Sequence, residues 1–141
     1  MTGNFFYPGG GIEAISDRVG GLVKKGDVVC IVAGGNDVQD GRSEDLIRRY
    51  REALEKVRME GGSAVACGIL PRFGYSREWA SRALGINQRI EKYCRDNNVA
   101  YVDGWEYFHG YRKLYARDGV HFSRLGVSVL AGLIDRAVGF C

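Results

Sequence analysis

The sequence predicts an α/β fold, a three-layer α/β/α sandwich in which a parallel sheet lies between two layers of helices. Short runs of apolar, β-branched residues alternate with longer stretches in which apolar residues recur every three or four positions. Each short run is apolar throughout, which is typical of a strand that helices cover on both faces. The chain has 141 residues, a length that suits one domain, so we expect a single domain over residues 1–141.

The first half of the chain contains two expected helices and one expected strand. Apolar residues with helical spacing predict a helix over residues 12–23, which Gly26 terminates. Residues 27–33 form an apolar run that predicts a buried strand. A loop over residues 34–42 follows this strand. We expect Ser43 to cap the next helix, whose inward face consists of Leu46, Ile47, Tyr50, Leu54 and Val57.

The same alternation continues in the second half. Gly61 and Gly62 end the helix, residues 63–69 predict the next buried strand, and residues 70–75 form a loop at its carboxyl end. The third helix ends near Asn97. Its apolar face consists of Trp79, Ala83, Ile86, Ile90 and Tyr93.

The last part of the chain is rich in aromatic residues. Residues 99–103 predict a short strand, residues 104–116 predict irregular helical turns, and a loop over residues 117–123 leads into a final helix. The apolar face of that helix consists of Leu125, Val129, Leu130, Leu133, Ile134 and Val138. Six aromatic residues favour packing but leave a ligand-binding pocket open: Tyr75, Trp79, Trp105, Tyr107, Phe108 and Tyr111.

Charge and hydropathy narrow the class of protein. The net charge of +3 does not demand nucleic acid, because the arginines are interspersed with acidic residues, as on a solvated helix face. Nucleic acid is therefore not the expected partner, although the arginine content leaves it open. The chain has no run of 18 apolar residues, so we expect no membrane span.

The four cysteines and two histidines do not form a metal-ligand pattern. No two cysteines stand in a Cys-x-x-Cys pair, so we expect neither a metal nor another cofactor. Cys30 and Cys67 lie in apolar runs and are expected to be small core residues. Thiols of this kind favour a reducing, cytoplasmic setting. A metal-dependent hydrolase is the least supported alternative, because no paired-histidine motif accompanies the acidic residues.

Residues that could carry chemistry follow the expected strands. Function in a parallel sheet collects at the carboxyl ends of the strands, which selects the loops over residues 8–11, 34–42 and 70–77. Asp118 and His121 stand three apart in Asp-Gly-Val-His, where a carboxylate can orient an imidazole and stabilise its charged form. On spacing alone, such a pair is more often structural. The Asp118–His121 pair carries function only if its loop, residues 117–123, lies beside the three loops at the carboxyl ends of the strands.

Two glycine-rich segments are further candidates. Asn36 follows a buried strand in Gly34-Gly35-Asn36-Asp37, where its side-chain amide could donate to an oxyanion. The same residue types also make an ordinary tight turn. Residues 8–11, Pro-Gly-Gly-Gly, could present backbone N–H groups to an anion.

Together these motifs resemble the SGNH (GDSL-type) hydrolase superfamily of esterases and lipases. The resemblance rests on the Pro-Gly turn, the strand that ends in Gly-Gly-Asn-Asp, and the Asp-Gly-Val-His-Phe-Ser loop before a terminal helix. It extends from about Tyr7 to about Leu133. It implies a flavodoxin-like parallel sheet and hydrolysis of small acyl esters.

The resemblance also implies roles for individual residues. His121 would be the general base, and Asp118 would orient it. The oxyanion hole would consist of the Asn36 side-chain amide and the Gly9 backbone N–H, with Gly10 and Gly34 as additional candidates.

The pattern departs from the family at the nucleophile. The family's serine lies in a Gly-Asp-Ser turn, but the one Gly-Asp here, Gly26-Asp27, is followed by Val28 and leads into a strand. The nucleophile is therefore unknown. Six serines, which favour helix caps and surface positions, are poor substitutes: Ser16, Ser43, Ser63, Ser76, Ser81 and Ser123.

We further expect the family's first strand to be missing, so that the domain is truncated at its N-terminus and begins at the second strand, residues 4–7. Residues 27–33 would then form an exposed sheet edge or pair directly with residues 4–7. An exposed apolar edge favours self-association.

Two functions remain open at this point. The first is a serine esterase or lipase-like hydrolase, in which this chain alone would be inactive or weak because the nucleophile is absent. The second is a non-catalytic binding or assembly domain from a retrotransposon-type reading frame. The presence of Asn36, Asp118 and His121 together favours the hydrolase.

Overall fold

A computed structural model describes residues 23–32, 35, 38, 39 and 41–139 of the chain. Its sheet has three parallel strands in the order β1 (Val28–Val32), β2 (Ser63–Cys67) and β3 (Ala100–Val102). In the register, Val28 lies opposite Ser63, and Val65 lies opposite Ala100. The expected parallel α/β sheet is confirmed.

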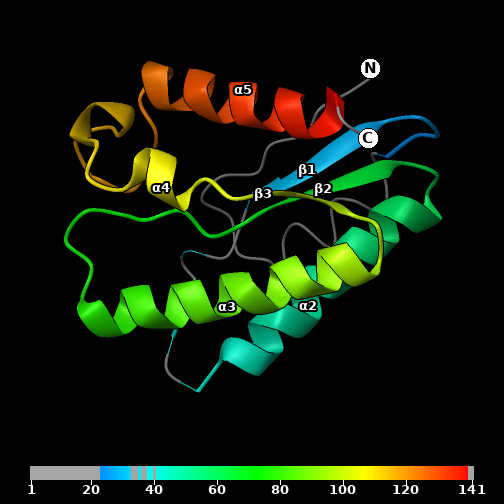
Figure 1. The fold of residues 1–141 in the computed structure, drawn as a ribbon, viewed down its shortest axis with the longest axis horizontal. Coiled ribbons are helices and arrows are strands. Elements are labelled where there is room, and N and C mark those ends of the chain that lie inside the picture. Colours follow the sequence, from blue (N-terminus) through cyan, green and yellow to red (C-terminus); the bar gives the residue numbers. More distant parts are fainter. Residues whose placement is uncertain (1–22, 33–34, 36–37, 40, 140–141) are drawn as a thin grey trace.

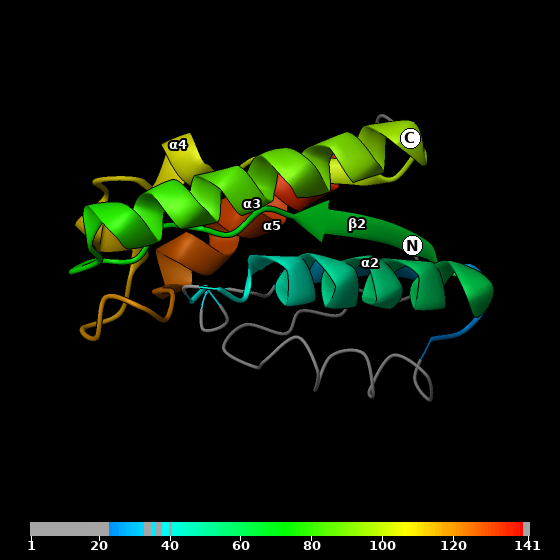
Figure 2. The same cartoon turned by 90° about the horizontal axis from the view of Figure 1, so that it is seen from below.

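Helices cover both faces of this sheet. Helices α2 (Ser43–Met59) and α3 (Arg77–Asp96) lie on one face, and α5 (Arg124–Gly139) lies on the other (Figures 1 and 2). Between β3 and α5 the chain forms the short helices α4 (Trp105–Phe108) and η2 (Arg112–Leu114). The expected helical turns in this region and the three-layer sandwich are therefore confirmed.

Alternate residues of each strand face opposite helix layers, because side chains in a strand alternate in direction. The layer under α2 and α3 buries Val29, Ile31, Ala64 and Ala66. The layer under α5 buries Cys30, Val32, Val65, Cys67 and Val102. Cys30 and Cys67 are thus the small core residues that the sequence predicts, and burial raises the pKa of Cys30 to about 12.

The end of α2 shows why two adjacent glycines terminate it. The Gly61 N–H donates to the Arg58 carbonyl oxygen, and the Gly62 N–H donates to the Val57 carbonyl oxygen. Gly61 has a φ of 87°, the left-handed conformation that this type of helix end requires. The expected boundary is confirmed.

Two expected details differ from the structure. Ser43 is the first residue of α2 rather than its cap, and Arg42, whose side chain makes no capping hydrogen bond, stands in the cap position. The prediction for Leu125 is also wrong, because this side chain is 53% exposed near the start of α5. The inward face of α5 is instead anchored by Leu130 and Ile134.

A buried tyrosine holds the carboxyl ends of β1 and β2. The Tyr50 hydroxyl on α2 lies 2.8 Å from the Ile31 carbonyl oxygen and 2.6 Å from the Cys67 carbonyl oxygen. Tyr50 is fully buried, and its desolvation raises the pKa of the phenol. The loops that follow these two strands therefore start from fixed positions.

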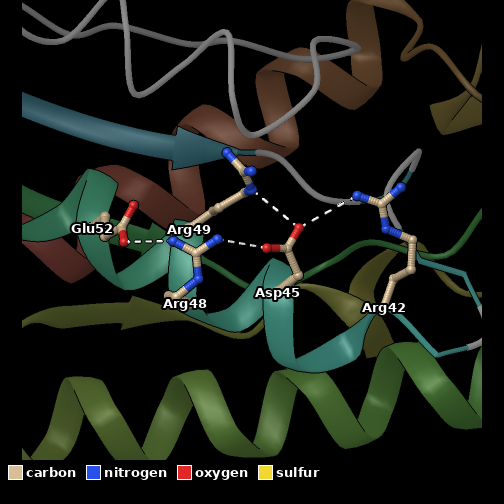
Figure 3. Close-up of polar contacts among 5 residues, drawn as sticks. All are labelled: Arg42, Asp45, Arg48, Arg49 and Glu52. Atoms are coloured by element: carbon tan, nitrogen blue, oxygen red, sulfur yellow. Dashed lines mark hydrogen bonds and ion pairs between the residues drawn. The ribbon is translucent and has the colours of Figure 1, made fainter.

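The N-terminal half of α2 shows how its arginines are used. Asp45 accepts hydrogen bonds from Arg48 at 2.6 Å and Arg49 at 3.1 Å, and Arg42 lies 3.4 Å away (Figure 3). Arg48 also pairs with Glu52 at 2.9 Å. The bonds from Arg48 and Arg49 lower the pKa of Asp45 to about 2. These arginines lie on a solvated, ion-paired helix face, as the sequence predicts.

None of the helices in the described part of the chain combines the length and apolar character needed to cross a bilayer. The expected helix over residues 12–23 and the strand over residues 4–7 lie outside the described residues. The proposed missing strand and self-association through the β1 edge therefore stay predictions.

Candidate active site

A tight loop at the carboxyl edge of the sheet carries Asp118 and His121. Tyr115 and Phe122 form an antiparallel bridge at the base of this loop. The Ala116 N–H donates to the His121 carbonyl oxygen at 2.8 Å, and the Gly119 N–H donates to the Ala116 carbonyl oxygen at 3.0 Å. Gly119 has a φ of 72°, which few residues other than glycine adopt without strain.

The loop brings the two side chains into contact. The Asp118 Oδ2 atom forms a short hydrogen bond with Nδ1 of His121. The other carboxylate oxygen, Oδ1, accepts the backbone N–H groups of Val120 and His121, both at 2.9 Å. Asp118 therefore accepts one bond from the imidazole and two from the backbone that carries it.

These bonds stabilise the charged carboxylate of Asp118. The hydrogen bond from His121, and then those from the backbone N–H groups of Val120 and His121, lower the pKa of Asp118 to about 2. Asp118 is therefore ionised throughout the neutral range. With Nδ1 facing this carboxylate, Nε2 of His121 is the ring nitrogen available for proton transfer, and 63% of the His121 side chain is exposed.

Three of the four loops selected from the sequence, those over residues 34–42, 70–77 and 117–123, meet at the carboxyl edge of the sheet. An added Cβ on Gly35, which follows β1, would lie 2.9 Å from Nη2 of Arg72 on the loop after β2. In turn, the Phe73 N–H donates to the Gly119 carbonyl oxygen at 3.0 Å. The segment after β1, the loop after β2 and the Asp118–His121 loop are thus in contact through Arg72 and Phe73.

The remaining predicted site residues are three glycines and one asparagine in the expected loops over residues 8–11 and 34–42. Gly9, Gly10, Gly34 and Asn36 lie outside the described residues. Their assignment to an oxyanion hole stays a prediction.

The serines near this edge have structural partners. The Ser76 hydroxyl caps α3 by accepting the Trp79 N–H at 3.0 Å. The Ser123 hydroxyl donates to the Lys113 carbonyl oxygen at 2.6 Å and accepts the Gly126 N–H at 3.1 Å. Both follow the capping role that the sequence predicts for its serines, and neither is placed as a nucleophile.

A small cavity lies between the loop after β2 and α4, with a volume of about 200 Å³. Tyr75 and Phe108 line it, while Tyr107 and Tyr111 are exposed and Trp105 is buried. Of the six aromatic residues considered from the sequence, two thus border a cavity, and the others pack or face solvent.

Sequence reasoning missed the residues that support the Asp118–His121 loop. Arg112 donates to the carbonyl oxygens of Ala116 and Arg117, and Phe73 bonds Gly119 from the neighbouring loop. No local motif singles out Arg112 among 15 arginines. Its role becomes visible only from the backbone that it contacts.

Comparison with known proteins identifies the family and the fold of the chain. Residues 7–129 match the model of the GDSL-like lipase/acylhydrolase family, which is most of the chain. No curated protein sequence matches. The esterase domain of the ORF1 protein from the zebrafish ZfL2-1 retrotransposon is 28% identical, with 94% of this chain and 84% of that chain covered and a TM-score of 0.63.

Two lipase structures show the same fold. A lipase from a goat rumen metagenome is 21% identical, with 92% and 74% of the two chains covered and a TM-score of 0.76. A GDSL-like lipase from Bacteroides thetaiotaomicron is 24% identical, with 79% of this chain and 62% of that chain covered and a TM-score of 0.67. The family match confirms the resemblance seen in the sequence. The chain belongs to the GDSL-like lipase/acylhydrolase family.

Proposed function

We propose that this protein hydrolyses small carboxylic esters, with His121 as the general base and Asp118 as the residue that orients it. The observation that carries this proposal is the contact between Nδ1 of His121 and the Asp118 carboxylate, on an exposed loop at the carboxyl edge of a parallel sheet. Family membership indicates an ester substrate.

In the proposed reaction, a serine Oγ attacks the ester carbonyl carbon while its proton passes to Nε2 of His121. The Asn36 amide and the N–H of Gly9 or Gly10 would hold the oxyanion, with Gly34 allowing close backbone approach. The bond from carbon to the leaving alcohol then breaks, and Nε2 returns the proton to that alcohol. Water, activated by the same base, hydrolyses the acyl-serine and regenerates the hydroxyl.

The nucleophilic serine is not assigned, because the 141 residues contain no Gly-Asp-Ser sequence. We therefore expect this chain alone to hydrolyse esters weakly or not at all, since removing one triad member leaves only residual catalysis.

Hydrolysis of p-nitrophenyl acetate tests the proposal, measured on these residues together with any segment that supplies a Gly-Asp-Ser serine. Asp118→Asn should lower kcat about 10⁴-fold, because an amide favours the wrong imidazole tautomer. His121→Ala should cause a comparable loss. His109→Ala is the matched control, because His109 is the other of the two histidines and stacks on Trp105 rather than contacting Asp118. Equal activity of His121→Ala and wild type would rule out the proposed base.

A second candidate function is a non-catalytic binding or assembly domain in a retrotransposon-type reading frame. The similarity to the ZfL2-1 ORF1 domain favours that origin, and the missing Gly-Asp-Ser sequence favours loss of catalysis. On this alternative, the folded protein would not hydrolyse esters. If it binds nucleic acid, its affinity would fall steeply with salt.

A cytoplasmic setting is also a proposal. Cys30, Cys67 and Cys94 are unpaired and buried, which suits a compartment that keeps thiols reduced.

A further inference from the structure

The Arg112 side chain binds the backbone that leads into Asp118. Its Nη1 donates to the Ala116 carbonyl oxygen at 2.6 Å and lies 3.4 Å from the Tyr115 carbonyl oxygen. Its Nη2 donates to the Arg117 carbonyl oxygen at 2.7 Å. A guanidinium presents several N–H donors in one rigid plane, so a single side chain can fix three successive carbonyl groups.

The same guanidinium packs against Phe73 on the neighbouring loop. Its central carbon lies 5.3 Å from the centre of the Phe73 ring, within the range of a cation–π contact. The Phe73 ring also meets Tyr115 edge-on, with the ring centres 5.0 Å apart. Because the Phe73 N–H bonds the Gly119 carbonyl oxygen, Arg112 and Phe73 together hold the loop on both sides of Asp118.

The Asp118–His121 pair needs such support because its side chains are not enclosed. The side chain of His121 is 63% exposed and that of Asp118 is 48% exposed. An exposed ion pair of this kind gains little energy from its own contact and readily exchanges between geometries. Its geometry therefore depends on the backbone of the loop, in which the Ala116 carbonyl oxygen accepts bonds from both Gly119 and Arg112.

We propose that Arg112 is a positioning residue whose guanidinium fixes the backbone ahead of Asp118, and so keeps the Asp118 carboxylate in contact with the His121 imidazole. The catalytic value of this contact rests on the proposed function. The positioning itself is a property of the loop and can be measured without substrate.

The test compares three variants of the chain by nuclear magnetic resonance. Arg112→Met removes the guanidinium, and Arg112→Lys keeps a positive charge but loses the planar fork. Arg117→Met is the matched control, because it removes one charge from the same loop, and the structure gives the Arg117 side chain no hydrogen bond or ion pair with the described residues. The measurements are the His121 Nδ1–H resonance, the Asp118 titration and the exchange of loop amides.

Both Arg112 variants should lose the hydrogen-bonded Nδ1–H resonance of His121. Both should also raise the pKa of Asp118 from about 2 toward its ordinary value of about 3.9. The amides of Val120 and His121 should exchange at least about tenfold faster, which corresponds to about 1.4 kcal/mol of lost protection. Arg117→Met should keep the resonance and the amide protection.

The proposal is overturned if Arg112→Met matches Arg117→Met in all three measurements. It is also overturned if Arg112→Lys retains wild-type behaviour, because charge alone would then suffice. If Arg112→Met does not fold, Arg112→Lys and Phe73→Leu decide the matter, since Phe73→Leu should increase amide exchange in the same loop. If Arg112→Met loses the contact between His121 and Asp118 but the wild-type protein does not hydrolyse esters, the positioning role stands and the proposed function is wrong.

Discussion

Gly126→Ala should destabilise the protein by about 3 kcal/mol and lower Tm by about 10 °C. A Cβ at Gly126 would overlap the Leu114 carbonyl oxygen, and it would lie 2.9 Å from the Leu114 carbonyl carbon and 3.2 Å from the Phe122 Cβ. No side-chain rotation relieves a clash with backbone. The start of α5 and η2 are also tied by Ser123, whose N–H donates to the Leu114 carbonyl oxygen at 3.0 Å. The whole junction must therefore move.

Gly132→Ala provides the matched control within the same helix. Outside the backbone of α5 itself, no atom of the described residues lies within 4 Å of a Cβ at Gly132, so this change should stabilise the protein by about 0.5–1 kcal/mol through helix propensity alone. Thermal melting of both variants should give shifts of opposite sign. Equal shifts would contradict the close approach of α5 to Leu114. The loop between η2 and α5 carries His121, so Gly126→Ala should also change the resonances of that residue.

Asn87→Leu should cost about 2–5 kcal/mol of unfolding free energy. Asn87 on α3 is buried, and its side chain bonds both backbone groups of Ile69. Its Oδ1 accepts the Ile69 N–H at 2.7 Å, and its Nδ2 donates to the Ile69 carbonyl oxygen at 3.0 Å. Leucine has a similar size but leaves both buried backbone groups without a partner. Chemical denaturation measures the loss.

Asn87→Asp separates hydrogen bonding from shape. A carboxylate can accept the Ile69 N–H but repels the Ile69 carbonyl oxygen, whereas a protonated carboxyl group can donate to it. The buried acid should have a raised pKa in the folded state, so its deficit against wild type should shrink as the pH falls below that pKa. A deficit independent of pH would contradict the assigned hydrogen bonds and would require another account of the packing at Asn87.

The fold could be predicted from the sequence because its main signals are local. An apolar strand such as residues 28–32, or a Gly61-Gly62 helix end, carries its own pattern, and the structure confirms both. The two wrong predictions, for Ser43 and Leu125, concern details of helix ends that a shift of one residue changes. Ser43 is a frequent capping residue, but the helix begins one residue earlier than that role requires. Leu125 fits an apolar period, yet its side chain is exposed, whereas the next residue, Gly126, faces Leu114.

The site was predictable only in part. Asp118 and His121 are separated only by Gly119 and Val120, so a short loop can bring them together, and it does. The support from Arg112 and Phe73 was not predictable. Phe73 is 46 residues from Gly119 in the sequence, with α3, β3, α4 and η2 between them. Only the packed sheet brings the two loops together.

Labelling with a fluorophosphonate, followed by intact mass measurement, tests the central claim most directly: these 141 residues hold the acid–base pair of a serine hydrolase but not its nucleophile. The folded 141-residue chain should gain no adduct. The same residues together with a segment that supplies a Gly-Asp-Ser serine should gain one adduct on that serine, and His121→Ala should abolish it. An adduct on the 141-residue chain, absent from its His121→Ala variant, would contradict the account, because an activated serine would then lie within these residues.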